Sequence, residues 1–248
     1  MILKIQNLTG GYSQGHDILQ GVELEIQEGD SAGIIEKGDV VDPIGFIGLN
    51  GSGKSTFAKA IMNCLPYRSG SLLFKGLDIS KKSTQELSQM GIVLFTQGGR
   101  IFDELSVYEN LLFIAKDKQK IDAIKEYFVT FQVDTVHLRK MRANKLSGGE
   151  RLQLALAMCF LKNPSLLIMD EPSAGLSPLA VNEMYRTLET LRIKNNLTTI
   201  LIEQNISRAV DFCSSLNLLR NGKIEYNADQ LKNKSLIIEE IRQIMFNK

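Results

Sequence analysis

The chain has 248 residues, which is long enough to bury a large core within one subdivided domain. Its 29 basic and 28 acidic residues give a net charge of +1, so overall charge favours neither nucleic acid nor an anionic membrane surface as a partner. No apolar run approaches the roughly 20 residues that span a bilayer, and the N-terminus is typical of a strand rather than of a signal peptide. We therefore expect that the protein cannot cross a membrane by itself.

Histidine and cysteine usage indicates no separate metal or disulfide framework. His16 and His137 are isolated, so they form no ligand cluster beyond what a phosphate site provides. The three cysteines lie far apart in apolar helical surroundings, and we expect buried free thiols in a reducing cytosol at Cys64, Cys159 and Cys213.

The first part of the chain predicts antiparallel strands. Residues 2–7 and 18–26 alternate apolar with polar side chains, and a glycine-rich break that holds Tyr12 separates them. Residues 71–79 predict a second strand pair with a glycine turn. The stretch 29–43 contains two Gly-Asp pairs and is predicted to form an extra turn or hairpin.

The rest of the chain predicts helices around buried parallel strands. Short apolar runs at 44–47, 92–96, 166–169 and 198–202 are typical of strands covered on both faces. Helical patterns fall at 57–65, 147–161, 182–195, 206–213 and 235–246, and Asn221-Gly222 predicts a hairpin within 216–226. Residues 107–141 are predicted to be mostly helical, as an insertion into an α/β sheet.

A phosphate-binding loop follows the first of these buried strands. The sequence GLNGSGKST has the G-x-x-x-x-G-K-[ST] pattern between an apolar strand and a helix, and that context disfavours a chance glycine loop. Backbone N–H groups and the helix dipole would hold phosphate there. Lys54 would reach the β- and γ-phosphates, and Ser55 would ligate Mg²⁺. The predicted ATP-binding residues of the loop are Gly48, Asn50, Gly51, Ser52, Gly53, Lys54, Ser55 and Thr56.

Two acidic residues end a second buried strand in the sequence LLIMDEP. Open parallel sheets bind ligands at the carboxyl ends of their strands. Asp170 is predicted to hold Mg²⁺, and Glu171 to polarise the attacking water beside the γ-phosphate. The alternative is a strand that simply leaves the core through two acids.

The sequence LSGGE opens a predicted helix and contains a second anion site. Ser147 and Glu150 form a capping-box pattern, which accounts for the local structure. It does not account for Gly148 and Gly149, which are poor helix formers but let phosphate approach a helix N-terminus. Two phosphate sites for one nucleotide suggest that the sites belong to different copies of the chain.

The order of GLNGSGKST, Gln97, LSGGE and LLIMDEP resembles that of the ATP-binding-cassette (ABC) ATPases over essentially the whole chain, and LSGG followed about twenty residues later by an apolar strand and DEP is specific to that family. The resemblance implies an α/β fold of the P-loop NTPase class, with a RecA-like core, an antiparallel β subdomain and an α-helical subdomain inserted at 98–146. Residues 1–248 would form a single nucleotide-binding domain. Two such domains would form a head-to-tail dimer, a homodimer or a heterodimer with a related ATPase, with two ATP molecules at its interface.

The resemblance also assigns roles that single residues would not justify. Tyr12 would stack on adenine, Gln97 would touch Mg²⁺ or water and couple to a membrane subunit, and Ser173–Pro178 would cross the dimer interface. The implied catalytic residues are Glu171, Gln204 and Lys54, the metal ligands are Ser55, Gln97 and Asp170, and the trans contacts are Ser147, Gly148, Gly149 and Glu150.

Two departures from the family pattern indicate one branch of it. Ser177 stands where most members have aspartate, and Gln204 stands where most have a histidine. With EPSAGLSP, the EQN sequence resembles the ATP-binding subunits of branched-chain or hydrophobic amino-acid importers. A glutamine amide can donate a hydrogen bond but cannot carry a proton, so Gln204 is predicted to sense the γ-phosphate rather than to transfer protons.

The predicted function is ATP hydrolysis that drives transport. ATP and Mg²⁺ would be bound, and permease subunits would dock on the helical subdomain and the Gln97 region at the cytoplasmic face of the membrane, with no nucleic-acid partner. The alternative is a soluble single-cassette ATPase, for example in iron–sulfur assembly. The transported substrate and the role of 29–43, which is about ten residues longer than the family needs, stay open: a surface hairpin, a partner contact or an altered nucleotide entrance.

Overall fold

The computed structural model describes residues 1–27, 44–117, 119, 121, 140–228 and 233–246. The predicted hairpin at 29–43 lies outside these residues, as does most of the second half of the predicted helical insertion. Among the described residues, none of the helices combines the length and apolarity needed to cross a membrane.

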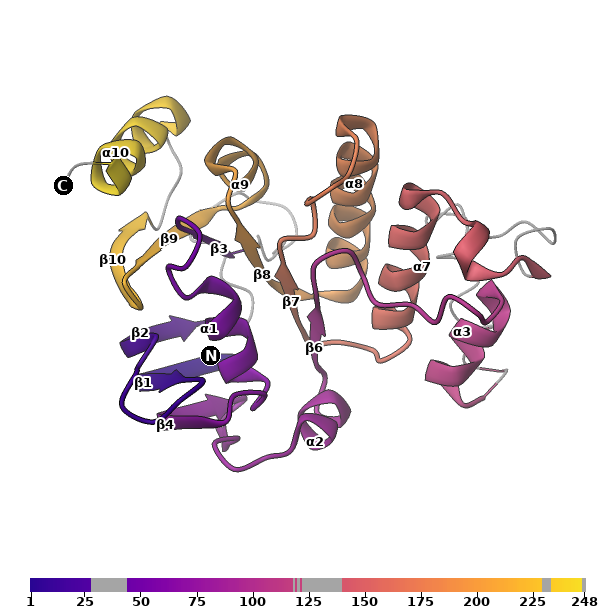
Figure 1. Ribbon diagram of the computed structural model, residues 1–248, viewed down its shortest axis with the longest axis horizontal. Coiled ribbons are helices and arrows are strands. Elements are labelled where there is room, and N and C mark those ends of the chain that lie inside the picture. The colour runs from indigo at the N-terminus through magenta and orange to yellow at the C-terminus, as the bar shows by residue number, and fades with distance from the viewer. Residues whose placement is uncertain (28–43, 118, 120, 122–139, 229–232, 247–248) are drawn as a thin grey trace.

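An antiparallel sheet forms the N-terminal part of the fold (Figure 1). Its strand order is β2-β1-β4-β5. The alternating pattern of the sequence predicted the antiparallel pairs β1–β2 and β4–β5, and both are confirmed. The pairing of β1 with β4, which joins the two pairs into one sheet, was not predicted. The strands are β1 (Leu3–Gly11), β2 (Leu19–Ile26), β4 (Tyr67–Phe74) and β5 (Leu77–Asp78).

A second, largely parallel sheet has the order β10-β9-β3-β8-β7-β6. Every residue of its strands β8 and β7 is buried, which fits their largely apolar sequences. The polar exceptions are Asp170 at the end of β7 and Thr198, Thr199 and Glu203 in β8. The predicted hairpin joins β9 to β10, with both Asn221 and Gly222 at positive φ as a type I′ turn requires. The strands are β3 (Ile44–Ile47), β6 (Ile92–Phe95), β7 (Leu166–Asp170), β8 (Thr198–Glu203), β9 (Ser215–Arg220) and β10 (Lys223–Ala228).

The predicted helices are present, but two of them have different ends. The first helix begins three residues earlier and ends four residues earlier than expected, and the helix predicted at 182–195 begins four residues earlier. A short helix after Ser83 was not predicted. The helices are α1 (Lys54–Ile61), α2 (Thr84–Gln89), α3 (Val107–Ala115), α7 (Gly148–Phe160), α8 (Pro178–Asn195), α9 (Ile206–Phe212) and α10 (Lys234–Phe246), with a 3₁₀ turn at Ala143–Lys145.

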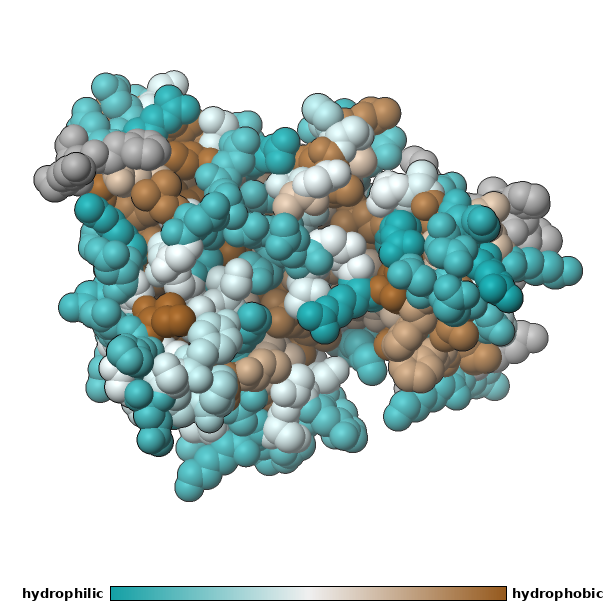
Figure 2. All heavy atoms as spheres, viewed as in Figure 1, coloured by the Kyte–Doolittle hydropathy of each residue, from teal (hydrophilic) through white to brown (hydrophobic). Residues whose placement is uncertain are grey.

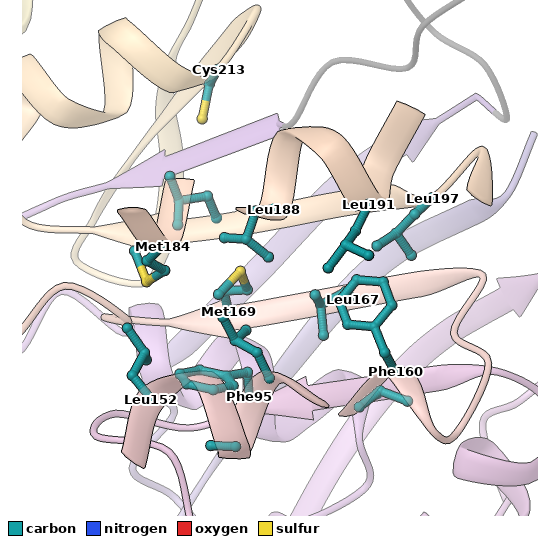
Figure 3. Close-up of a cluster of buried hydrophobic side chains, with 14 of the residues drawn as sticks. Phe95, Leu152, Phe160, Leu167, Met169, Met184, Leu188, Leu191, Leu197 and Cys213 are labelled. Atoms are coloured by element: carbon teal, nitrogen blue, oxygen red, sulfur yellow. The ribbon is translucent and has the colours of Figure 1, made fainter. Parts of the chain in front are cut away.

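The parallel sheet separates two apolar cores. On one face, α1 packs between this sheet and the antiparallel sheet, in a core that contains Phe46 and Phe57. On the other face, Leu167 and Met169 of β7 lie among side chains of α7 and α8 (Figure 3). Successive strand residues alternate between these cores, so the carboxyl ends of β3 and β7 are held rigidly at one edge.

The expectation of three buried thiols is wrong for one of them. Cys213 is buried and Cys159 is partly buried, but Cys64 is exposed. The reason is that α1 ends at Ile61, and the chain then turns through Asn63 in the left-handed region. Cys64 therefore lies beyond the buried face of the helix.

Candidate nucleotide-binding site

The predicted phosphate loop connects β3 to α1 and is shaped by its glycines. Gly53 has φ +105° and caps α1, and Gly51 has φ +81°, so neither position favours a side chain. A Cβ on Gly48 would lie 2.3 Å from the carbonyl oxygen of Leu219, which forbids any larger residue. The loop is thus held against the β9–β10 hairpin with its N–H groups available to an anion.

Two polar side chains of the loop, those of Lys54 and Ser52, are buried. The Lys54 ammonium donates hydrogen bonds to the carbonyl oxygens of Gly48, at 2.8 Å, and Leu49, at 3.0 Å. Burial lowers the pKa of Lys54, and the carboxylates of Glu171 and Asp170 oppose that shift. The Ser52 hydroxyl is buried with no hydrogen-bond partner among the described residues. The ammonium and the hydroxyl could both donate hydrogen bonds to phosphate oxygens.

The predicted metal ligands Ser55 and Asp170 meet across the site. The Ser55 hydroxyl of α1 donates to Asp170 Oδ1 at the end of β7, at 3.0 Å. Asp170 is only 8% exposed, and its burial raises its pKa. A hydroxyl and a buried carboxylate in contact form a set of hard oxygen donors that fits Mg²⁺. The third predicted ligand, Gln97, lies exposed in the turn after β6, and its side chain makes no hydrogen bond with either group within the described part of the chain.

Glu171 and Gln204 are in direct contact at the carboxyl ends of β7 and β8. The Gln204 amide donates to Glu171 Oε1 at 2.6 Å. Glu171 has φ +48°, an unfavourable value for a non-glycine residue, and its N–H donates to the carbonyl oxygen of Ile202 at 3.0 Å. The backbone therefore aims this carboxylate out of the strand and toward Gln204.

Sequence reasoning missed three polar residues behind this pair. Glu203 is buried and accepts from the Tyr185 hydroxyl at 3.0 Å and from the backbone N–H of Gln204 at 3.3 Å. Arg208 donates to the Ser173 hydroxyl at 2.9 Å. An acid inside a buried strand was the available signal for Glu203, whereas the partners of Arg208 and Tyr185 are far away in sequence.

The predicted trans contact lies apart from the phosphate loop. Ser147 caps α7, and its hydroxyl and the Glu150 carboxylate form the expected capping box. A Cβ on Gly148 would meet no atom within 4 Å, so this helix end faces open space. In Figure 1, α1 lies to the left of β7 and α7 to its right, so the two helix ends that are predicted to bind anions do not converge within one chain.

Tyr12 occupies the loop after β1, as predicted, and its side chain is 49% exposed. Its hydroxyl accepts a hydrogen bond from the Lys59 ammonium of α1 at 3.0 Å. Lys59 was not predicted as a site residue, although it lies four residues after Ser55 on the same face of α1.

The fold and the phosphate loop define a P-loop ATPase domain. The sequence pattern of the ABC transporter family matches residues 19–174, more than half of the chain. The chain belongs to this family and is an ATP-binding subunit of an ABC transporter. Members of the family hydrolyse ATP. ABC cassettes form dimers and work with membrane permease subunits.

Three similar proteins illustrate the range of the family. The probable branched-chain amino acid transport ATP-binding protein LivF of Archaeoglobus fulgidus is 31% identical over 91% of both chains. The lipopolysaccharide export system ATP-binding protein LptB of Escherichia coli K12 is 27% identical over 90% of this chain and 88% of its own. The ADP conformation of MJ1267, an ATP-binding cassette of an ABC transporter, superimposes with a TM-score of 0.83 at 24% identity, over 100% of this chain and 99% of that chain.

Proposed function

We propose that two such chains, or this chain and a related ATPase, close head to tail around two ATP molecules and drive a permease. The observation that carries the proposal is the separation of two anion-binding helix ends: α1 follows the phosphate loop, while the N-terminus of α7 faces open space. Each ATP would lie between the loop of one chain and Ser147–Glu150 of the other. The site of a single chain is then incomplete.

The residues of one half-site divide the work of hydrolysis. Lys54 would leave its loop carbonyls for the β- and γ-phosphates, because phosphate oxygens are better partners for an ammonium than carbonyls are. Glu171 would accept a proton from the attacking water, and Gln204 would hold that carboxylate and sense the γ-phosphate.

Mg²⁺ would be held by Ser55 and Asp170, with Gln97 brought in by closure. When bound, it would neutralise charge that develops on the phosphate oxygens. The raised pKa of Asp170 reflects burial of a carboxylate that has one neutral donor, Ser55. A divalent cation would offset that burial.

The permease is proposed to dock beside Gln97, on the helical subdomain that would span 98–146. A cavity of about 320 Å³ opens between β6, α2, α3 and α7, and its lining includes Thr96, Arg100, Ile114 and Lys162. Apolar side chains gather over α3 next to it (Figure 2), where Phe102 and Phe113 are exposed and packed together. The described residues that line the cavity include two cations and no acid, so an amphipathic segment with an acidic residue fits it. The chain would then be peripheral on the cytoplasmic face of the membrane.

Branched-chain or hydrophobic amino acids are the proposed cargo. Support comes from Gln204 and the EPSAGLSP sequence, together with the name of the LivF relative. The LptB relative covers nearly the same share of the chain, and lipopolysaccharide export is therefore the rival assignment.

The test uses tagged Glu171→Gln chains purified from their native membrane. This variant keeps the phosphate loop but loses the proton acceptor, so it should bind ATP, hydrolyse it very slowly and run as an ATP-dependent dimer on size exclusion. A monomer with and without ATP, together with intact turnover, would refute the proposed function.

Tagged wild-type chains, purified in the same way, address the cargo. We expect permease subunits to copurify, and we expect branched-chain amino acids with their binding protein to stimulate the wild-type assembly. Stimulation by lipopolysaccharide alone would transfer the assignment to export.

A further inference from the structure

Lys59 is a cation of α1 that the assigned steps of phosphate binding and hydrolysis do not use. It lies in the last turn of the helix, one turn beyond Ser55, and its side chain is half-buried. A lysine at this end of a helix is stabilised by the helix dipole in any case. Its contact with Tyr12, 47 residues earlier in the chain, is not explained by that effect.

The geometry of the contact places the ammonium near the hydroxyl end of the tyrosine. The Lys59 Nζ atom lies 3.0 Å from the Tyr12 hydroxyl oxygen but 5.3 Å from the centre of the ring. The cation therefore approaches the edge that carries the hydroxyl more closely than the centre of a face. Such a contact fixes the direction of the ring while leaving ring surface for a flat partner.

The loop that carries Tyr12 is fixed at its other end by the antiparallel sheet. The Tyr67 hydroxyl of β4 donates to the carboxylate of Asp17, and the backbone N–H of His16 donates to the carbonyl oxygen of Ser13. At the far end of the loop, Ile18 lies beside Gly53 at the start of α1. Near Tyr12 itself, the hydrogen bond from Lys59 is the one that the described residues show between this loop and α1. This hydrogen bond links the position of the Tyr12 ring to that of the phosphate loop, which leads into α1.

We propose that Lys59 is a positioning residue that sets the Tyr12 ring at the correct distance from the phosphate loop for an adenine base. This inference rests on the proposed stacking role of Tyr12. Lys59 would act through the ring and not on the phosphates, so it would contribute to the affinity for the whole nucleotide and not for its triphosphate part.

The competing account is electrostatic. The charge of Lys59 also acts to lower the pKa of Asp170, so its field reaches the phosphate side of the site. A lysine that worked in this way would strengthen the binding of any polyphosphate, with or without a base. Comparing ATP with inorganic tripolyphosphate separates the two accounts.

The experiment measures binding of ATP and of tripolyphosphate by calorimetry to the full chain. Lys59→Met keeps the aliphatic stem and removes the donor, and Tyr12→Phe keeps the ring and removes the acceptor. We expect each change to weaken ATP binding by about three- to tenfold, the size of one exposed hydrogen bond, and to leave tripolyphosphate affinity unchanged. The double variant should be no weaker than either single one.

The control variants are Lys59→Arg, which retains a donor and should restore most of the affinity, and Lys81→Met on an exposed loop, which should change nothing. Equal loss for both ligands, additive effects, or unchanged ATP affinity in Lys59→Met would overturn the inference. Wild-type chain that failed to bind ATP would instead overturn the proposed function.

Discussion

At the scale of single residues, Gln204 holds the carboxylate of Glu171, the proposed proton acceptor. Its amide donates to Glu171 at 2.6 Å, and an amide keeps that donor at every physiological pH. A histidine in the same place would donate and also titrate near neutral pH. If Glu171 accepts the proton as proposed, the hydrolysis step in this chain would lack one source of pH dependence.

We predict that Gln204→His introduces that dependence. The neighbouring Glu171 carboxylate would raise the pKa of the new imidazole above its usual value of about 6.5. Below that raised pKa, the imidazolium would pair with Glu171 and make it a weaker proton acceptor, so turnover of the variant should fall relative to wild type as pH drops. Above it, the two rates should run in parallel.

The measurement is the ratio of the two kcat values between about pH 6 and pH 9. Gln204→Ala serves as the control, because it removes the donor and introduces no titrating group. It should slow turnover by roughly ten- to a hundredfold, the value of a hydrogen bond to a charged group, at all these pH values. A constant ratio for Gln204→His would show that residue 204 does not act through Glu171.

At the scale of elements, three helices begin with the same capping box, and in one of them we propose that it has a second role in binding phosphate. Ser83 caps α2, Ser106 caps α3 and Ser147 caps α7, each with a glutamate three residues on. Of the three, only α7 follows its cap with two glycines, and a Cβ on the first of them would meet no atom within 4 Å. Its cap is therefore proposed to serve both the helix and a phosphate of the partner.

Ser147→Ala and Ser83→Ala form a matched pair for this proposal. Each removes one capping hydroxyl, so each should lower the free energy of unfolding by about 1 kcal/mol. We expect only Ser147→Ala to weaken ATP-dependent dimerisation and to lower ATPase activity, since α2 lies away from the phosphate loop. Thermal unfolding and a steady-state ATPase assay measure the two effects. Equal ATPase loss in both variants would mean that stability alone explains it.

An element of this fold could be predicted from the sequence where a local pattern of residues specifies it. Short, largely apolar runs predicted β7 and β8, and the alternation of apolar with polar residues predicted the strand pairs of the antiparallel sheet, because those patterns are local. The six-residue helix α2 buries only Leu87 and so has no periodicity, although Ser83 and Glu86 were a usable signal. The early start of α8 was marked by Ser177 followed by Pro178, a cap and a favoured first residue.

The site residues that belong to a motif covering a strand and the loop after it could be predicted from the sequence. The contacts that form between segments far apart in the sequence could not. The sequence pointed to Ser55 and Asp170, and in the structure a hydrogen bond of 3.0 Å joins them. Lys59 reaches Tyr12 because the antiparallel sheet packs on α1, and no local sequence pattern encodes that contact between distant segments. The contact of Gln204 with Glu171 depends in the same way on the pairing of β7 with β8.

At the scale of the whole molecule, each chain would carry two halves of different sites. The phosphate loop, Asp170 and Glu171 belong to one half, and the N-terminus of α7 belongs to the other. In a head-to-tail dimer with twofold symmetry, a defect in the first half of one chain and a defect in the second half of the other fall in the same composite site. The remaining site of that mixed dimer is then built only from intact halves.

Mixing two inactive variants should therefore restore hydrolysis. Lys54→Ala damages the phosphate loop, and Gly148→Asp places a negative charge where the trans phosphate would lie. Residue 148 has room for a side chain, and an acid in the first turn suits a helix, so the fold should tolerate this change. Random pairing makes about half of the dimers mixed, so we expect about a quarter of the wild-type ATPase rate if the sites act independently.

The matched control mixes Lys54→Ala with Glu171→Gln. Both of these defects lie in the same half, so a mixed dimer has one defect in each composite site and should stay inactive. Complementation in the first mixture and none in the second requires that the phosphate loop of one chain work with the α7 terminus of the other. Recovery in both mixtures, or in neither while dimers still form with ATP, would exclude the head-to-tail arrangement, because no other assignment of halves predicts this difference.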